Sequence, residues 1–261
     1  MRPQTRFSGL VSLMAASPLL AQQALDDWDL TVDAARRVTL ASSAFSSGQT
    51  IAVRCSAGTL DVMIAGLPAR EGVSRYLELG RGDAKAEPAH WLNNGGTIFS
   101  TTPARTAREL RRQGRLEVAV AVEPDDDSAL RRYQFELPSG SAAVEQVLNA
   151  CDTPVDEARD SLPRWVQPRT YPPSLWRSLL RPEFPQAAAS AGIESGFVVL
   201  GCVVAPQGRL ADCTIEHESD RRAGFGRATL RSSATARLSE PTEGGPAPGE
   251  VIIFTVRFRV S

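Results

Sequence analysis

The sequence is poor in the residues from which most catalytic and metal sites are built. Its 261 residues include only two histidines, His90 and His217, and four cysteines. The cysteines form no Cys-x-x-Cys pair, and no nucleophile elbow, P-loop or Gly-x-Gly-x-x-Gly stretch occurs. We therefore expect no catalytic residue, no metal site and no cofactor, and we expect both histidines to have structural roles.

Strong net charge and long apolar runs are also absent. The formal net charge is −1, with 42% hydrophobic and 23% charged residues. This composition is typical of a globular protein and gives no global reason to expect a nucleic-acid partner. Lys85 is the only lysine in the chain, and we attribute the excess of arginine to codon usage. No segment after the N-terminus reaches the length needed to cross a bilayer, so we expect no stable membrane insertion of the mature protein.

The first 21 residues have the pattern of a secretory leader. Arg2 and Arg6 precede a short apolar run at residues 10–20, and Ala21 is followed by polar residues. The run is shorter than the ~20 residues of a membrane-spanning helix, and the pattern is typical of a cleavable signal peptide. We therefore predict a signal peptide at residues 1–21 and a periplasmic mature protein.

The stretch GCVVAPQGRLADC, residues 201–213, predicts a hairpin with a cysteine near each end. A four-residue loop at residues 206–209 would place Cys202 opposite Cys213, at a spacing that a disulfide tolerates. A three-residue loop would shift the register by one and separate the sulfurs. We favour a disulfide over two free thiols or a metal site.

The pairing of Cys202 with Cys213 leaves Cys55 and Cys151 as a second pair. We predict that these two cysteines also form a disulfide, which would tie a strand to the end of a helix. Two disulfides require an oxidising compartment, which agrees with the predicted export.

The chain divides into two regions of α+β character. Residues 25–151 alternate like a β-rich domain and contain two expected helices, at residues 102–113 and 141–150. Residues 152–182 contain six prolines and are expected to form a semi-rigid linker. Residues 183–261 form the second predicted domain.

Two charged stretches have more than one reading. Arg105, Arg108 and Arg112 lie on one face of the first expected helix, where they either meet an anionic lipid or acidic partner or form a solvated face. The acidic run at residues 125–127 lacks the ligand spacing of a calcium loop and is read as a solvated turn.

Several short motifs follow one another in the second domain. The motifs are Phe184-Pro185, Gly192-Ile193-Glu194, the Pro206-Gln207-Gly208-Arg209 hairpin, a helix with Phe225 and Ala228, and a terminal strand of alternating aromatic and basic residues. In the content, order and spacing of these motifs, residues 183–260 resemble the C-terminal domain of TonB-family energy transducers.

The resemblance implies a three-stranded antiparallel sheet with two helices on one face. It also implies a protein partner, such as an outer-membrane transporter, whose extended peptide is bound by strand addition. In the N-terminal domain, residues 28–33 and 51–66 are similar to secreted bacterial proteins of the invasion-associated locus B type.

The terminal strand is the predicted binding site. As the last strand of a small sheet it is expected at an edge, with unpaired backbone groups. We expect Ile252, Phe254, Val256, Phe258 and Val260 to point to the core. The peptide-binding edge is expected to present the four alternate residues Ile253, Thr255, Arg257 and Arg259.

Two other functions remain open at this point. One is a secreted, envelope-remodelling hydrolase with a site that no motif marks. The other is a true energy transducer, which would require the leader to stay in place as a membrane anchor.

Overall fold

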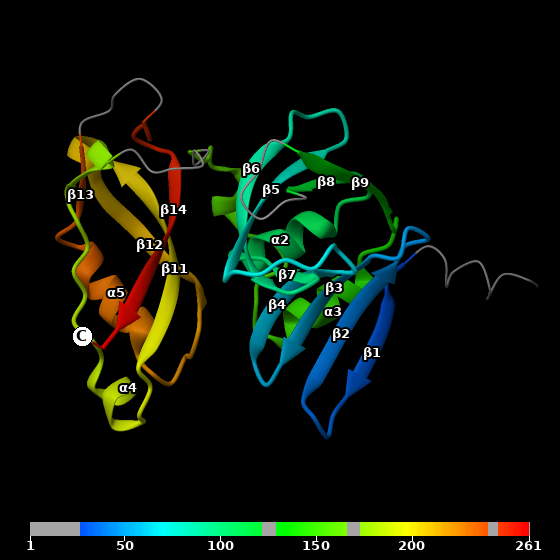
Figure 1. Cartoon of the computed structure of the whole chain (residues 1–261), viewed down its shortest axis with the longest axis horizontal. Coiled ribbons are helices and arrows are strands. Elements are labelled where there is room, and N and C mark those ends of the chain that lie inside the picture. Colours follow the sequence, from blue (N-terminus) through cyan, green and yellow to red (C-terminus); the bar gives the residue numbers. More distant parts are fainter. Residues whose placement is uncertain (1–26, 122–128, 166–172, 240–244, 261) are drawn as a thin grey trace, which may run out of the picture.

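The computed structural model describes residues 27–121, 129–165, 173–239 and 245–260 (Figure 1). It confirms the α+β class, with one antiparallel sheet in the N-terminal part and another in the C-terminal part. The predicted signal peptide at residues 1–21 and the acidic run at residues 125–127 lie outside the described residues.

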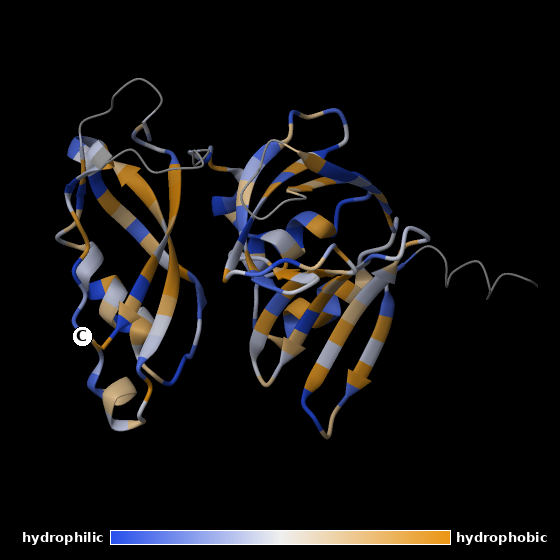
Figure 2. Ribbon diagram, viewed as in Figure 1, coloured by the Kyte–Doolittle hydropathy of each residue, from blue (hydrophilic) through white to orange (hydrophobic). Residues whose placement is uncertain are grey.

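The N-terminal sheet contains nine strands in the order β1-β2-β3-β4-β7-β6-β5-β8-β9. Apolar and polar residues alternate along many of these strands, as expected for a sheet with one buried face (Figure 2). The strands are β1 (Asp29–Asp33), β2 (Val38–Ala44), β3 (Thr50–Ser56), β4 (Thr59–Ala65), β5 (Ser74–Arg81), β6 (Glu87–Asn94), β7 (Thr97–Phe99), β8 (Gly114–Ala121) and β9 (Leu130–Leu137).

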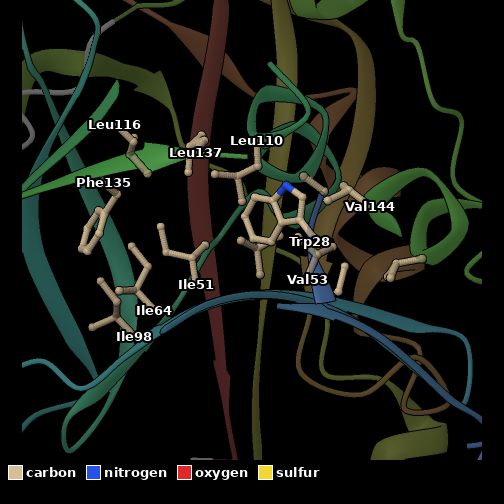
Figure 3. Close-up of a cluster of buried hydrophobic side chains, with 14 of the residues drawn as sticks. Trp28, Ile51, Val53, Ile64, Ile98, Leu110, Leu116, Phe135, Leu137 and Val144 are labelled. Atoms are coloured by element: carbon tan, nitrogen blue, oxygen red, sulfur yellow. The ribbon is translucent and has the colours of Figure 1, made fainter. Parts of the chain in front are cut away.

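Two helices pack against this sheet, α2 (Pro103–Leu110) and α3 (Ala142–Ala150), close to the two predicted ranges. Pro103 suits the first turn of α2 because its missing N–H has no partner there in any helix. Buried side chains from both helices and from most strands form one core around Trp28 (Figure 3). The Sγ atoms of Cys55 and Cys151 lie 2.06 Å apart, so the end of α3 is tied to β3 as predicted.

The arginines of α2 hold the segment that follows α3. Arg108 forms a two-pronged ion pair with Asp160, at 2.5 and 3.1 Å. Arg105 donates to the backbone oxygen of Asp160 at 3.0 Å, and Arg111 pairs with Asp156 at 3.1 Å. Two arginines of the predicted face, Arg105 and Arg108, therefore contact the chain's own Asp160, which lies in the 3-10 helix η1 (Ala158–Ser161).

The C-terminal sheet has five strands, in the order β10-β13-β12-β11-β14, and not the three that were expected. The two additional strands are short and lie on the side of the sheet away from β14. The strands are β10 (Trp176–Ser178), β11 (Ser195–Ala205), β12 (Arg209–Glu218), β13 (Arg237–Leu238) and β14 (Val251–Arg259). The 3-10 helix η2 (Pro173–Leu175) leads into β10, so the end of the predicted linker is part of this sheet.

Two helices, α4 (Gln186–Ser190) and α5 (Phe225–Ser233), cover one face of the C-terminal sheet. Phe225 at the start of α5 is fully buried and lies over Gly196 of β11. A Cβ at position 196 would come within 2.2 Å of the Phe225 ring, so only glycine allows this close packing.

The β11–β12 hairpin corrects the predicted register. Its loop is the three-residue turn η3 (Pro206–Gly208), which pairs Val204 with Leu210 and not with Ala211. A β-bulge between Gly201 and Val203 then shifts the pairing by one residue. The shift restores the facing of the two cysteines, and the Sγ atoms of Cys202 and Cys213 lie 2.07 Å apart.

Candidate functional site: the outer edge of β14 and the cleft beside it

Strand β14 lies at the end of the C-terminal sheet and pairs with β11 over its whole length. The two residues that flank β14, Glu250 and Val260, are even-numbered and bond toward β11. Val204 N–H donates to Glu250 O at 2.8 Å, and Val260 N–H donates to Glu194 O at 2.9 Å. Because backbone groups alternate along a strand, the odd-numbered residues present their N–H and C=O groups to the other side.

The first of these odd residues already has a partner there. Val251 N–H donates to Pro163 O at 2.8 Å, and Trp165 N–H donates to Val251 O at 3.1 Å. Residues 163–165 thus add to the outer edge of β14 in parallel, through the bridge between Arg164 and Val251. Farther along, at residues 255–259, no described strand pairs with this edge.

The side chains of β14 also separate by parity. Ile252, Phe254 and Phe258 are buried against the helix-covered face, as predicted. Val260 is an exception, because its side chain is 53% exposed rather than in the core.

The predicted edge residues share the opposite face. Three residues of β11 share this face, because each pairs with one of the predicted edge residues: Gly201 with Ile253, Val199 with Thr255, and Phe197 with Arg257.

This face forms one wall of a cleft of about 1090 Å³ between the two parts of the chain. The C-terminal wall includes Phe197 and Val199 of β11 and Ile253, Thr255 and Arg257 of β14. The other wall comes from β5, β6 and the end of α2, and Arg164 and Trp165 lie at the point where the two walls meet. Figure 1 shows β14 on the side of the C-terminal sheet that lies next to β6 and α2.

The cleft is lined by more positive than negative side chains. Two acidic residues, Glu87 and Glu109, face six basic ones. The basic residues are Arg81, Lys85, Arg112, Arg115, Arg164 and Arg257. Since the whole chain has a formal net charge of −1, the positive charge is concentrated at this place.

Polar contacts join the two parts around the cleft. Arg164 pairs with Glu87 of β6 at 3.1 Å, and Arg221 donates to Gly58 O at 2.8 Å. Arg159 donates to the Thr214 hydroxyl of β12. Gly201 leaves room for this arginine, because a Cβ there would come within 3.1 Å of Arg159 Nη2.

Both histidines lie near this junction. His90 lines the cleft and packs edge-on against Tyr76, with ring centroids 5.5 Å apart. His217 packs against Phe197 at 5.6 Å. Burial lowers the pKa of His217; the carboxylate of Asp61 opposes this effect and the charge of Arg221 adds to it.

The structure brings together residues that the sequence did not connect. The predicted edge lies in one cleft with Arg112 and Lys85, which come from the distant N-terminal part. Arg112 was assigned to one stripe with Arg105 and Arg108, but those two contact Asp160. Arg112 is exposed, and it lines both the cleft and the smaller pocket beside residues 155–160. The sequence shows all of these residues but not their juxtaposition.

The described residues contain no group of three or more His, Cys, Asp or Glu placed to hold a metal ion. None of the described helices is long and apolar enough to cross a membrane. The four cysteines lie in the two disulfide pairs, one in each part of the chain.

Comparison with known proteins identifies the C-terminal part. Residues 181–260 match the family described as Gram-negative bacterial TonB protein C-terminal. No curated protein matches the chain. The match does not extend to the N-terminal part, whose likeness to invasion-associated locus B type proteins stays a prediction. Domains of the matched family transduce energy without catalysis and interact with proteins such as outer-membrane transporters. Residues 181–260 are therefore a TonB C-terminal-like domain, which associates the protein with the cell envelope.

Proposed function

We propose that this is an exported periplasmic protein that binds an extended peptide of a partner protein by adding it as a strand to β14. In this proposal residues 152–182 are the linker, residues 183–261 are the binding domain, and the partner belongs to the outer membrane or its transport systems. The binding edge comprises Ile253, Thr255, Arg257 and Arg259.

One observation carries the proposal: residues 163–165 already add to this edge at Val251. The same alternation directs the N–H and C=O groups of Thr255, Arg257 and Arg259 to the same side. An edge of this kind is a template for another chain, and main-chain hydrogen bonds supply the affinity in strand addition. At about 3.3 Å per residue, residues 255–259 offer roughly 16 Å of edge.

Thr255 offers a direct test because its N–H points away from β11. Proline at the outward position of an edge strand removes a donor without breaking the ladder on the inner side. The test is selection from a displayed library of random seven-residue peptides on the wild-type protein. Selected peptides should bind Thr255→Pro at least about tenfold more weakly, which corresponds to roughly 1.4 kcal/mol.

Thr255→Val is the matched control, because it keeps the backbone donor and removes only the hydroxyl. It should bind the selected peptides as the wild type does. If folded Thr255→Pro binds them equally well, β14 is not the binding site.

Export is tested separately at the N-terminus. The mature chain is expected to begin near Gln22 and to be recovered in the periplasmic fraction. Recovery of a chain that starts at Met1 in the inner-membrane fraction would favour a membrane-anchored energy transducer instead.

A further inference from the structure

The cleft has charges that its own contacts leave unneutralised. Arg115 pairs with Asp83 at 3.1 Å, and Arg164 pairs with Glu87 at the same distance. The Arg81 guanidinium donates to the backbone oxygens of Glu109 and Arg112. These three cations therefore already have acceptors.

Three other cations that line the cleft are exposed: Lys85, Arg112 and Arg257. None of them forms an ion pair with a carboxylate among the described residues. Lys85 lies in the turn between β5 and β6, Arg112 lies two residues after the end of α2, and Arg257 lies in β14. Two of the three thus belong to the N-terminal part and face a cleft whose opposite wall is the binding sheet.

A strand added to β14 would present every second side chain to this cleft. Directly opposed side chains on neighbouring strands lie about 4.5–5.5 Å apart at their Cβ atoms. A carboxylate of the added strand would therefore lie beside Arg257 of β14. The same side chain would face the wall that carries Lys85 and Arg112.

We infer that the two parts of the chain form one composite site for an acidic extended peptide. In this site β14 binds the peptide backbone, and Lys85 and Arg112 of the N-terminal part select Asp or Glu at alternate positions. The inference rests on the proposed function and extends it, because it gives the N-terminal part a role in recognition and the partner a stated chemistry.

The experiment combines a peptide change with a protein change. The probes are peptides enriched from the seven-residue library on the wild-type protein, each compared with its Glu→Gln or Asp→Asn analogue. The protein variant is Lys85→Gln/Arg112→Gln. The matched control is Arg222→Gln/Arg227→Gln, which removes the same charge from exposed positions that do not line the cleft.

Enriched peptides should carry Asp or Glu at alternate positions. Neutralising one such position should weaken binding to the wild type and to the control variant by about two- to fivefold, as expected for exposed charge pairs. In Lys85→Gln/Arg112→Gln the same peptide change should have less than about half of that effect on a logarithmic scale, since Arg257 remains.

Other results separate the two proposals. If the enriched peptides depend on the Thr255 N–H but show no acidic preference, or an equal one in Lys85→Gln/Arg112→Gln, the composite site is wrong and strand addition stands. If no enriched peptide loses affinity for Thr255→Pro, strand addition fails and the composite site fails with it.

Discussion

The two parts of this chain differ in how much of each sheet is buried. The nine-stranded sheet and its two helices enclose a single core around Trp28, and a disulfide between residues 96 positions apart ties that core together. The five-stranded sheet buries one face under α4 and α5 in two smaller clusters, and its disulfide spans only 11 positions. Its other face lines the cleft, and its last strand lies at an edge.

In the proposed function the two parts of the chain have different roles. The large core supports β5, β6 and α2, the elements next to Lys85 and Arg112. A small sheet with an edge strand is suited to accept another strand. The polar contacts at Arg159, Arg164 and Arg221 join the two parts, so the edge faces a defined wall rather than open solvent.

The largest expected effect contrasts the two disulfides. On the chain-entropy relation, replacing Cys55 and Cys151 by alanine should lower the free energy of unfolding by about 4–5 kcal/mol. Replacing Cys202 and Cys213 should lower it by about 3 kcal/mol, because the closed loop is shorter. Denaturant unfolding of both double variants measures the difference. Equal losses would show that loop length does not set the stability that a disulfide contributes. Free thiols found by non-reducing peptide mapping of the wild type would show that the disulfides are not formed.

A smaller effect is expected where the N-terminal part holds the segment that leads to the C-terminal sheet. The side chains of Arg108 and Asp160 are only 10% and 18% exposed. Arg108→Ala should therefore lower the free energy of unfolding by about 1.5–3 kcal/mol, the range for hydrogen bonds to charged groups. Arg112→Ala, at an exposed position just after α2, is the control and should change it by less than about 0.5 kcal/mol. Similar losses in the two variants would show that the ion pair of Arg108 with Asp160 stabilises the fold no more than an exposed arginine does.

The smallest effect is a pH dependence at the junction. The pKa of His217 is lowered by burial, whereas an unfolded histidine titrates near pH 6.5. Below about pH 6.5 the unfolded chain thus binds a proton at this position more readily than the folded chain does. The free energy of unfolding should therefore fall as the pH is lowered from about 7 toward the folded pKa.

His217→Gln should remove this contribution, which unfolding curves at about pH 7 and pH 5 would detect. The acidic groups with lowered pKa values, Glu117 and Glu145, are present in both the wild type and His217→Gln, so their contribution cancels in this comparison. An unchanged slope in His217→Gln would show that the proton binds elsewhere.

Local patterns predicted much of each part. Alternation predicted a β-rich region at residues 25–151, to which β3 and β4 belong, and the helix expected at residues 102–113 is α2. The terminal strand and the residues on each of its faces could also be predicted, because its apolar residues repeat with period two. These features depend on neighbours in sequence, which a single chain displays directly.

Features that depend on distant residues were not predictable. The three-residue turn alone would have separated Cys202 from Cys213, and the bulge that brings them together includes Asp212 at a φ of 46°. No local sequence pattern predicted this positive φ at Asp212. Likewise, Arg108 and Arg112 look alike in the sequence, and only the fold shows that one holds Asp160 whereas the other lines the cleft.

Amide hydrogen exchange along β14 tests the central claim most directly, with the inward amides of the same strand as the control. In the free protein the amides of Phe254 and Val256, which pair with β11, should exchange slowly, while those of Thr255 and Arg257 should exchange fast. At saturation with the most enriched library peptide, strand addition predicts that Thr255 and Arg257 become protected and that Phe254 and Val256 stay protected. If Thr255 and Arg257 still exchange fast with the peptide bound, the outer edge of β14 is not where it binds.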